Sequence, residues 1–524
     1  MKYRNIKLFI PIVSLVFTFG MVSCVNDLNV EPIDPSVTQT FNQDGVFTKI
    51  YASLGLTGQQ GPAGKGDVAG IDEGTSDFVR LLWNLNEMST DEAICSWGDP
   101  GIPELNFNKW SSSHNQITGL YGRLYFGVTL CNHFLEQTAG KTDEVSVKQR
   151  AEARFVRAMD YYFLMDLFGN VPFTEVVSLT PPTQISRADL FLFVEKELKE
   201  CEADMYDARL APYGRADKVA NWLLRSRLYL NAEVYTGTQR WSDAAIYAKK
   251  VIDSEYKLNP SYQQLFMADN DGSTVNKAPQ EIIFAISADG VKTQNYGSAL
   301  FLIASTHTSG MPSWGSTEGW GGNRARAALA KKFFPTGTIN SNELSSDSTT
   351  GAGDKRAMFF IKDRTIEITS VSIFKQGLSV MKFKNNRADG ANPHDTKFVD
   401  MDVPFLRVAE AYLTYAEAVQ RGGTKIGGYE ALTAVNALRA RSNATELSTL
   451  NLATILDEKG REFYFEGQRR TDLIRFGNYG GSDYNWDWKG GTAGGTKFSA
   501  IYNLFPIPST DLNANSNLTQ NPGY

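Results

Sequence analysis

Residues 151–168 read Ala-Glu-Ala-Arg-Phe-Val-Arg-Ala-Met-Asp-Tyr-Tyr-Phe-Leu-Met-Asp-Leu-Phe. Phe155, Met159 and Tyr162 recur at helical spacing, and Arg154 and Asp160 fall on the polar side. The pattern predicts an amphipathic helix with a wide apolar face. Such a face has to be buried against neighbouring elements, so this stretch indicates a helical scaffold.

Further stretches of the same kind occur on both sides of a long loop-rich region. Apolar residues repeat every four positions in 216–235, and a turn at 236–240 leads to a second apolar stripe that starts at Trp241. A third pair of helices is predicted at 405–420 and 429–441, and a last helix from about Ile455 to Phe476. Small residues where helices would meet, with aromatic residues between them, are typical of tetratricopeptide-like hairpins of irregular period.

The composition changes between these helical stretches. Residues 270–400 are rich in Gly, Ser, Thr and Asn, residues 57–75 are rich in Gly and Gln, and 335–354 reads as a flexible excursion. We therefore predict a mainly α fold. Its tetratricopeptide-like scaffold covers about 115–260 and 403–477, and its loop-rich binding region with short strands covers about 57–110 and 270–400.

The N-terminus resembles a bacterial lipoprotein signal. Lys2, Arg4 and Lys7 precede an apolar run over 8–19 that is too short to cross a bilayer, and the segment ends at Ser23-Cys24. We expect removal of residues 1–23 and acylation of Cys24, which would hold the folded part, 24–524, to a membrane surface. An ordinary signal peptide with a chance cysteine is the alternative.

Composition and charge narrow the classes of partner that the protein can bind. Of 524 residues, 42% are hydrophobic and 12% aromatic, which allows a large core. Without residues 1–23 the chain carries 49 basic and 58 acidic residues, a formal charge of −9, which argues against nucleic acid. Three further cysteines, at 95, 131 and 201, do not form a disulfide framework, and Cys131 and Cys201 are predicted to be buried thiols.

No catalytic, metal or cofactor pattern stands out. The four histidines share no ligand spacing, and no phosphate-binding glycine motif is present. Asp269-Asn270-Asp271-Gly272 begins like a calcium loop, but its glycine is misplaced, so a polar turn is predicted, with structural or adventitious calcium as the alternative. Carboxylates are dense at 458–472, but interleaved arginines favour an ion-pair network over a glycosidase pair.

Large aromatic residues in polar loops are the remaining unusual feature. A ring in a Gly/Ser loop either anchors the loop or presents a face to a ligand. Sugars suit such faces, because a pyranose has an apolar face that stacks on a ring and hydroxyls that need a few polar groups. These loop aromatics are Trp97, Tyr296, Trp314, Trp320, Trp486 and Trp488.

Several strings of the sequence together carry a family resemblance. They lie at 151–158, 166–173 (Asp-Leu-Phe-Gly-Asn-Val-Pro-Phe), 215–230, 406–418, 461–477 (Arg-Glu-Phe-Tyr-Phe-Glu-Gly-Gln-Arg-Arg-Thr-Asp-Leu-Ile-Arg-Phe-Gly), 505–508 and 520–524. Through them the chain resembles the SusD/RagB family of outer-membrane lipoproteins of the Bacteroidota, and its starch-binding member above all, from the signal to the last residue. The resemblance implies a non-catalytic glycan-binding protein that works as a lid on a TonB-dependent SusC-like transporter, without a cofactor.

The resemblance also implies the site. By matching position, an arc of aromatic rings would cup a helical α-1,4-glucan, and polar residues beside it would meet the sugar hydroxyls. Two departures stand out, because Cys95 replaces a tryptophan of the arc and the loop after Trp97 is shortened, which leaves Asp99 or Pro100 nearest to an asparagine that contacts sugar. The implied residues are Trp97, Tyr296 and Trp320 in the arc and Asp72, Arg80 and Asp99 beside it.

Three functions remain open at this point. The first is surface binding of starch-type α-glucans and their delivery to the transporter. The second is an exported glycoside hydrolase, which needs two carboxylates facing a bound chain. The third is a purely structural lid that binds no sugar, or that binds peptide. Within the first function, a different glycan bound by the same site is the alternative to a starch-type glucan.

Overall fold

The computed structural model describes residues 40–339 and 349–524. The chain divides into two compact units, Met1–Gln43 and Asp44–Tyr524. The signal segment and Cys24 lie outside the described residues, as does the middle of the predicted excursion at 335–354. The account below concerns the second unit.

The quoted stretch forms most of a long helix, α6 (Glu144–Phe168), which packs between α5 (Asn115–Gln137) and α7 (Arg187–Cys201). Helix α6 begins earlier than the quoted stretch because Asp143 caps it, accepting a hydrogen bond from the Ser146 N–H at 3.0 Å. A Cβ atom on Gly127 of α5 would lie 2.2 Å from Asp160 Oδ2, so only glycine allows α5 and α6 to approach this closely.

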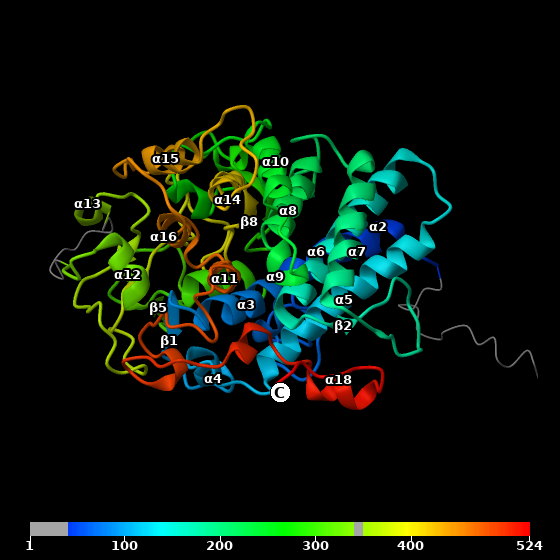
Figure 1. The fold of residues 1–524 in the computed structure, drawn as a ribbon, viewed down its shortest axis with the longest axis horizontal. Helices are drawn as coiled ribbons and strands as arrows, with labels where there is room; N and C mark the ends of the chain where they lie inside the picture. The colour runs from blue at the N-terminus through cyan, green and yellow to red at the C-terminus, as the bar shows by residue number, and fades with distance from the viewer. Residues whose placement is uncertain (1–39, 340–348) are drawn as a thin grey trace, which may run out of the picture. The chain divides into compact units, whose positions relative to one another are not determined.

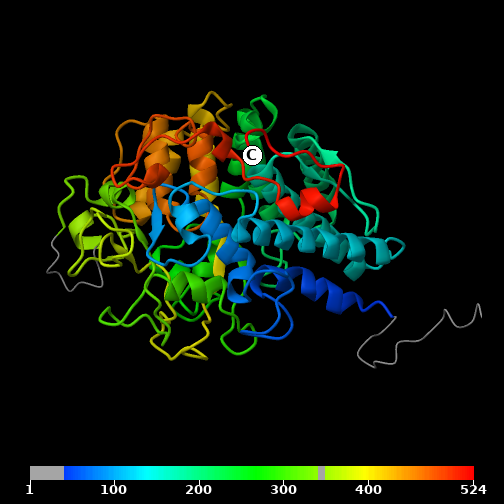
Figure 2. The same cartoon turned by 90° about the horizontal axis from the view of Figure 1, so that it is seen from below.

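A second group of helices packs beside the first. Helix α8 (Lys218–Leu230) packs on α10 (Trp241–Ile252), which packs on α14 (Val408–Gln420), and α14 in turn packs on α15 (Ala431–Arg441). Figure 1 shows α8, α10 and α14 side by side, and Figure 2 shows the same scaffold from below. The predicted mainly helical, hairpin-based fold is confirmed.

Two predicted helices have different bounds. Residues 405–407 belong to strand β8 (Val403–Arg407), and the stretch 455–476 forms α16 (Leu452–Phe463) and α17 (Arg469–Arg475) instead of one helix. The break between α16 and α17 contains Phe465 and Gly467, both with positive φ (65° and 80°). This turn directs the Phe465 ring onto Trp83, with centroids 5.2 Å apart, so burial of an aromatic ring accompanies the interruption of the helix.

The strands are short and form antiparallel pairs within the loop-rich region and beside the helices. Strand β1 (Ala93–Cys95) pairs with β5 (Asn323–Ala325), and β4 (Ile282–Ile286) pairs with β8. The other pairs are β2 (Val171–Pro172) with β3 (Gln184–Ile185) and β6 (Phe359–Phe360) with β7 (Ser379–Val380). The β1–β5 pair joins the two loop-rich stretches of the sequence, because one of its strands belongs to 57–110 and the other to 270–400.

Apart from α2 (Gln43–Gly55), the elements not yet described are short. No helix within residues 40–339 and 349–524 has the length and apolar character that a membrane crossing requires. The remaining elements are α2 (Gln43–Gly55), η2 (Gly74–Ser76), α3 (Phe78–Trp83), η3 (Asn84–Met88), α4 (Ile102–Asn106), η4 (Glu202–Asp204), α9 (Ala232–Thr236), η5 (Gln263–Phe266), η6 (Ala278–Gln280), α11 (Ser298–Ala304), α12 (Ala327–Phe333), α13 (Thr349–Ala352), η7 (Lys489–Gly491), η8 (Ala500–Asn503) and α18 (Ser509–Ala514).

Candidate functional site

All six of the site residues expected from the resemblance line one surface depression of about 520 Å³. They come from the 57–110 stretch and from the first half of the 270–400 stretch, which α3, α11 and the β1–β5 pair bring together (Figure 1). The lining residues are Asp72, Thr75, Arg80, Trp97, Asp99, Pro100, Ile102, Asn115, Gln116, Tyr296 and Trp320.

Trp97 and Trp320 form one side of the depression. Their ring centroids are 6.3 Å apart and the ring planes meet at 51°, so the two faces are inclined to each other instead of stacked. Both rings are half-buried. Two inclined aromatic faces with open surface suit a curved chain of sugar rings better than a flat ligand.

The position of both tryptophans follows from the β1–β5 pairing. Beyond the strands the pairing continues, since the Ser96 N–H donates to the Gly322 carbonyl at 3.0 Å. Trp320 is held through its backbone N–H on the Ala304 carbonyl at 2.7 Å and through its indole N–H on Glu318 Oε2 at 2.8 Å. The arc is therefore supported by main-chain hydrogen bonds from elements outside it.

Tyr296 lines the same depression from a separate loop, immediately before α11. A Cβ atom on Gly74 would lie 2.6 Å from the Tyr296 Cβ, so the tyrosine sits directly against the backbone of the 57–75 loop. Its ring contacts Phe398, with centroids 5.7 Å apart, and Lys397 Nζ lies 5.3 Å from the ring centroid. The contact with Gly74 is a constraint that only a small residue in that loop satisfies.

Arg80 links the aromatic and polar parts of the site. Its guanidinium lies over the Phe301 ring at 4.9 Å and donates to the Tyr296 carbonyl at 3.2 Å. Burial lowers the pKa of Arg80, although Asp72 and Asp77 favour its charge. Within the described residues its Nε–H has no acceptor, so the side chain retains one donor that no protein group uses.

The two carboxylates of the site are exposed. Asp72 Oδ1 accepts a hydrogen bond from the Thr75 N–H at 3.1 Å, which fixes its orientation at the start of η2. Asp99 lies in the shortened loop after Trp97 and is also exposed. Both oxygen groups stand where they can accept hydrogen bonds from a ligand.

Sequence reasoning missed an amide pair at the start of α5. Asn115 and Gln116 line the depression, and Asn115 Nδ2 donates to the Pro100 carbonyl at 3.3 Å. The start of α5 thus places an amide beside the loop after Trp97, where the resemblance implied an asparagine. Only the Asn-Gln dipeptide at a helix start could have indicated this in the sequence, and Thr75 and Ile102, which also line the site, carried no signal.

Cys95 does not take part in the site surface. It is fully buried in β1, opposite Asn323 of β5, and burial raises the pKa of its thiol to about 12. At this position the chain therefore presents neither a ring face nor a reactive thiol. Cys131 and Cys201 are buried as predicted.

The other loop aromatics serve the fold. Trp314 lies beside the His307 ring, with centroids 5.1 Å apart, and Trp488 donates its indole N–H to the Ile368 carbonyl at 2.9 Å. Trp486 is buried and stacks on Tyr479 at 6.2 Å and 22°. These contacts support the structural interpretation for the three residues.

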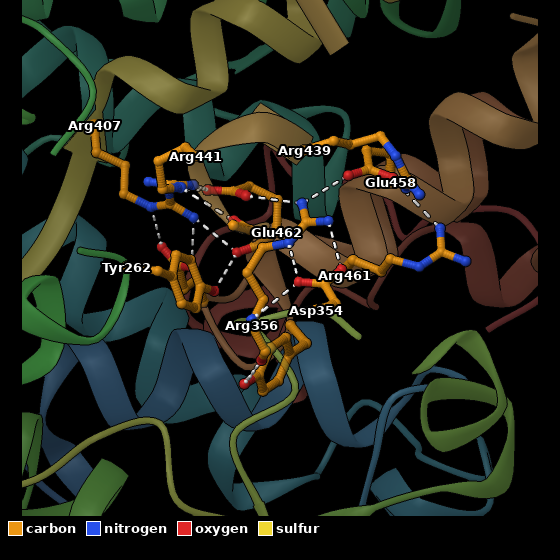
Figure 3. Close-up of polar contacts among 12 residues, drawn as sticks. Tyr262, Asp354, Arg356, Arg407, Arg439, Arg441, Glu458, Arg461 and Glu462 are labelled. Atoms are coloured by element: carbon orange, nitrogen blue, oxygen red, sulfur yellow. Dashed lines mark hydrogen bonds and ion pairs between the residues drawn. The ribbon is translucent and has the colours of Figure 1, made fainter. Parts of the chain in front are cut away.

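The carboxylates of the last helices form an ion-pair network, as predicted (Figure 3). Glu462 contacts Arg407 at 2.6 Å and Arg356 at 3.1 Å, and Glu458 contacts Arg356 at 2.6 Å and Arg439 at 2.7 Å. Most of the partner arginines come from β8, α15 and the segment after α13, and few from the same helix. The network is buried and braces the scaffold against the loop region.

Two groups of residues bear on metal binding. Asp269 and Asn270 form the predicted polar turn, in which Asp269 accepts from Ser273 Oγ at 2.9 Å and from the Ala388 N–H at 2.9 Å. Among the described residues, ligand atoms of Asp289, His394 and Asp400 lie within 4.8 Å of one another, a grouping that the sequence spacing does not reveal. Both oxygens of Asp400 already accept backbone N–H groups, of residues 290 and 394.

Comparisons with known proteins show the family and the fold of the chain. Residues 374–524 match a family model described as the SusD family, and residues 69–251 match one described as starch-binding associating with outer membrane. The chain is 44% identical to the starch-binding protein SusD of Bacteroides thetaiotaomicron, with all of both chains covered. It is 24% identical to a SusD-like protein of Bacteroides ovatus, covering 69% of this chain and 66% of that one.

Solved structures share the fold. A surface glycan-binding protein A from Bacteroides thetaiotaomicron in complex with laminarihexaose has a TM-score of 0.66 and 20% identity, covering 91% of this chain and 98% of that chain. The corresponding protein from Bacteroides fluxus has a TM-score of 0.67 and 19% identity, with 92% and 99% covered.

Proposed function

The chain belongs to the SusD family, and from this premise we propose that it binds starch-type α-glucans and maltooligosaccharides without cleaving them. The site would be the arc of Trp97, Tyr296 and Trp320, which supplies the stacking faces. Asp72, Arg80 and Asp99 would meet the sugar hydroxyls. A relative that is 44% identical over the whole length of both chains carries starch binding in its name.

One observation carries the proposal. Residues from distant parts of the sequence meet around one depression, and they combine inclined aromatic faces with exposed carboxylates, an arginine and two amides. This is the combination that a pyranose chain requires, because each ring offers an apolar face and a rim of hydroxyls. An open arc should bind weakly, with a Kd of about 0.1–1 mM, or roughly −5.5 to −4 kcal/mol.

The arrangement of carboxylates supports binding without hydrolysis. A glycosidase needs one carboxyl group kept protonated by an apolar environment and a second one across the scissile bond. In the depression, Asp72 and Asp99 are both exposed to solvent. The dense carboxylates at Glu458 and Glu462 are buried in ion pairs away from it.

The proposal includes a place at the cell surface. The chain would be processed before Cys24, acylated there, and held at the outer membrane facing outward, with a SusC-like TonB-dependent transporter as partner and 24–524 as the folded part. Weak binding suits this role, because a polymer that contacts many copies gains by multivalency and each copy releases quickly. No cofactor enters the proposal, and calcium would have at most a structural role.

The test is a calorimetric titration of the purified protein with maltoheptaose and α-cyclodextrin, followed by chromatography of the mixture. We expect saturable binding of both and unchanged oligosaccharide lengths. Shortened products would favour the hydrolase. Failure of both ligands to bind would contradict the starch-type site, and binding of a different polysaccharide in a wider panel would then identify another glycan as the ligand.

A further inference from the structure

A second depression adjoins the aromatic arc. It has a volume of about 650 Å³ and is formed mainly by the 63–74 loop. Asp72 and Tyr296 line both depressions, so the two meet at these residues. Tyr296 therefore stands between two hollows of similar size and is not the end of the site.

The wall of this second depression, the loop groove, is formed by one nearly continuous stretch of the loop together with Tyr296. Lys65, Val68, Ala69 and Gly70 line it with Asp72 and Tyr296. From Val68 to Ile71 neither the N–H nor the C=O groups form a hydrogen bond with any residue that the structure describes. Backbone groups left unpaired by the protein bind water or a ligand, so this run leaves donors and acceptors available along a stretch that lines the groove.

The loop is held firmly on both sides of this run. Before it, Asp67 pairs with Lys49 at 2.7 Å and with Arg123 at 3.3 Å. After it, Glu73 accepts hydrogen bonds from the Thr57 hydroxyl and from the Ala63 N–H. The unpaired backbone thus belongs to a loop whose ends are anchored, which limits the entropy lost when a ligand orders it.

Apolar side chains of the loop also fit notches in the scaffold. A Cβ atom on Gly119 of α5 would lie 2.9 Å from Ile71 Cδ1, and one on Gly122 would lie 3.3 Å from Val68 Cγ1. With these side chains turned onto the helix, the backbone of the same residues is left for the groove. The loop groove is therefore a preformed feature of the fold.

We infer that the loop groove is a second binding segment, which takes the continuation of a linear, uncharged glycan chain beyond the rings held by the aromatic arc. This inference rests on the proposed function. Alternating backbone donors and acceptors match the hydroxyls of a sugar, each of which can donate and accept. The exposed Asp72 at the junction, in a chain of net negative charge, disfavours polyanionic glycans.

Comparing the binding of a cyclic glucan with that of a linear glucan distinguishes the aromatic arc from the loop groove. α-Cyclodextrin can occupy the arc but has no end to extend, whereas a long linear maltodextrin can continue into the loop groove. We expect the purified protein to bind the long maltodextrin about tenfold more tightly than α-cyclodextrin, counted per binding site, because a second linked contact adds to the first.

The matched variants are Ala69→Trp, which fills the groove at an exposed alanine, and Ala139→Trp, a control at an exposed alanine outside both depressions. Ala69→Trp should lose the gain for the long chain and bind α-cyclodextrin within about twofold of the parent. Ala139→Trp should keep both affinities. Thermal melting of each variant checks that the fold is retained.

Hydrogen exchange provides a readout without substitution. Peptides that span 68–72 should exchange more slowly with the long maltodextrin bound, and not with α-cyclodextrin. Equal affinity of the parent for the two ligands, equal effects of Ala69→Trp on both, or unchanged exchange at 68–72 would overturn the inference while the arc stands. Failure of α-cyclodextrin to bind the parent would overturn the proposed function, and this inference with it.

Discussion

The ring of Trp97 lies directly on the backbone of Gly322, where a Cβ atom would come within 2.2 Å of the indole carbon Cε2. Position 322 has to be glycine, because any side chain there would occupy the position of the Trp97 ring. Gly322 also accepts a hydrogen bond from the Ser96 N–H at 3.0 Å, which fixes the distance between the two loops. The orientation of the aromatic arc depends on this contact.

Gly322→Ala should displace Trp97 and weaken α-cyclodextrin binding by about tenfold, near 1.4 kcal/mol. Calorimetry measures the loss. The control is Gly98→Ala in the neighbouring loop, where a Cβ atom would meet nothing within 4 Å. Equal affinities of the two alanine variants would contradict the role of Gly322 in setting the ring.

Trp320→Ala should nearly abolish glucan binding, since it removes one of the two inclined aromatic faces. Truncation of a central aromatic residue in a binding site typically costs about 2 kcal/mol or more of binding free energy. Trp488→Ala serves as the comparison, because that ring lies outside the depression. Affinity electrophoresis in starch gels shows both results, and retained binding by Trp320→Ala would exclude this residue from the site.

Glu462→Gln should lower the free energy of unfolding by about 3–5 kcal/mol, because it leaves the buried guanidinium groups of Arg407, Arg441 and Arg356 without their shared counter-charge. Urea unfolding measures the loss. Glu430→Gln, which removes an exposed pair with Lys425, should change stability by less than about 1 kcal/mol. Glucan affinity should be unchanged in both variants.

The same network predicts sensitivity to acid. Burial works against the charge of Glu462, but Arg441 and Arg407 hold its pKa well below the usual range. Its stabilising contribution is therefore complete above the unfolded-state pKa of about 4.5 and is lost as the pH falls below it. Unfolding followed from pH 7 to pH 3 should show this loss in the parent and a weaker pH dependence in Glu462→Gln.

The pH dependence of stability that comes from Glu92 should have the opposite sign to that from Glu462. Burial raises its pKa from 4.5 to about 7, against the opposing charge of Arg469. A carboxyl with a raised folded-state pKa contributes full stability below pH 4.5 and loses it as the pH rises to about 7. Glu92→Gln should therefore gain stability relative to the parent between these pH values, by up to about 3 kcal/mol. A difference independent of pH would contradict this.

Much of the scaffold was predictable because its signals are local. The apolar spacing in 151–168 and 216–235 predicts helices, and α6, α8 and α9 are found there. The helix predicted from Ile455 to Phe476 was wrong in its middle, because burial of the Phe465 ring against Trp83 outweighs the helical pattern. Periodicity reports one face of a helix and carries no information on a distant partner.

The sequence by itself determined the helical class, the family resemblance and the residues proposed for the arc. Only the tertiary structure decided that Trp97, Tyr296 and Trp320 share one depression with Asn115, that Cys95 is buried beneath it, and that the loop groove adjoins it. The physical reason lies in the β1–β5 pairing. It joins segments more than two hundred residues apart, and such a contact depends on the packing of the whole chain.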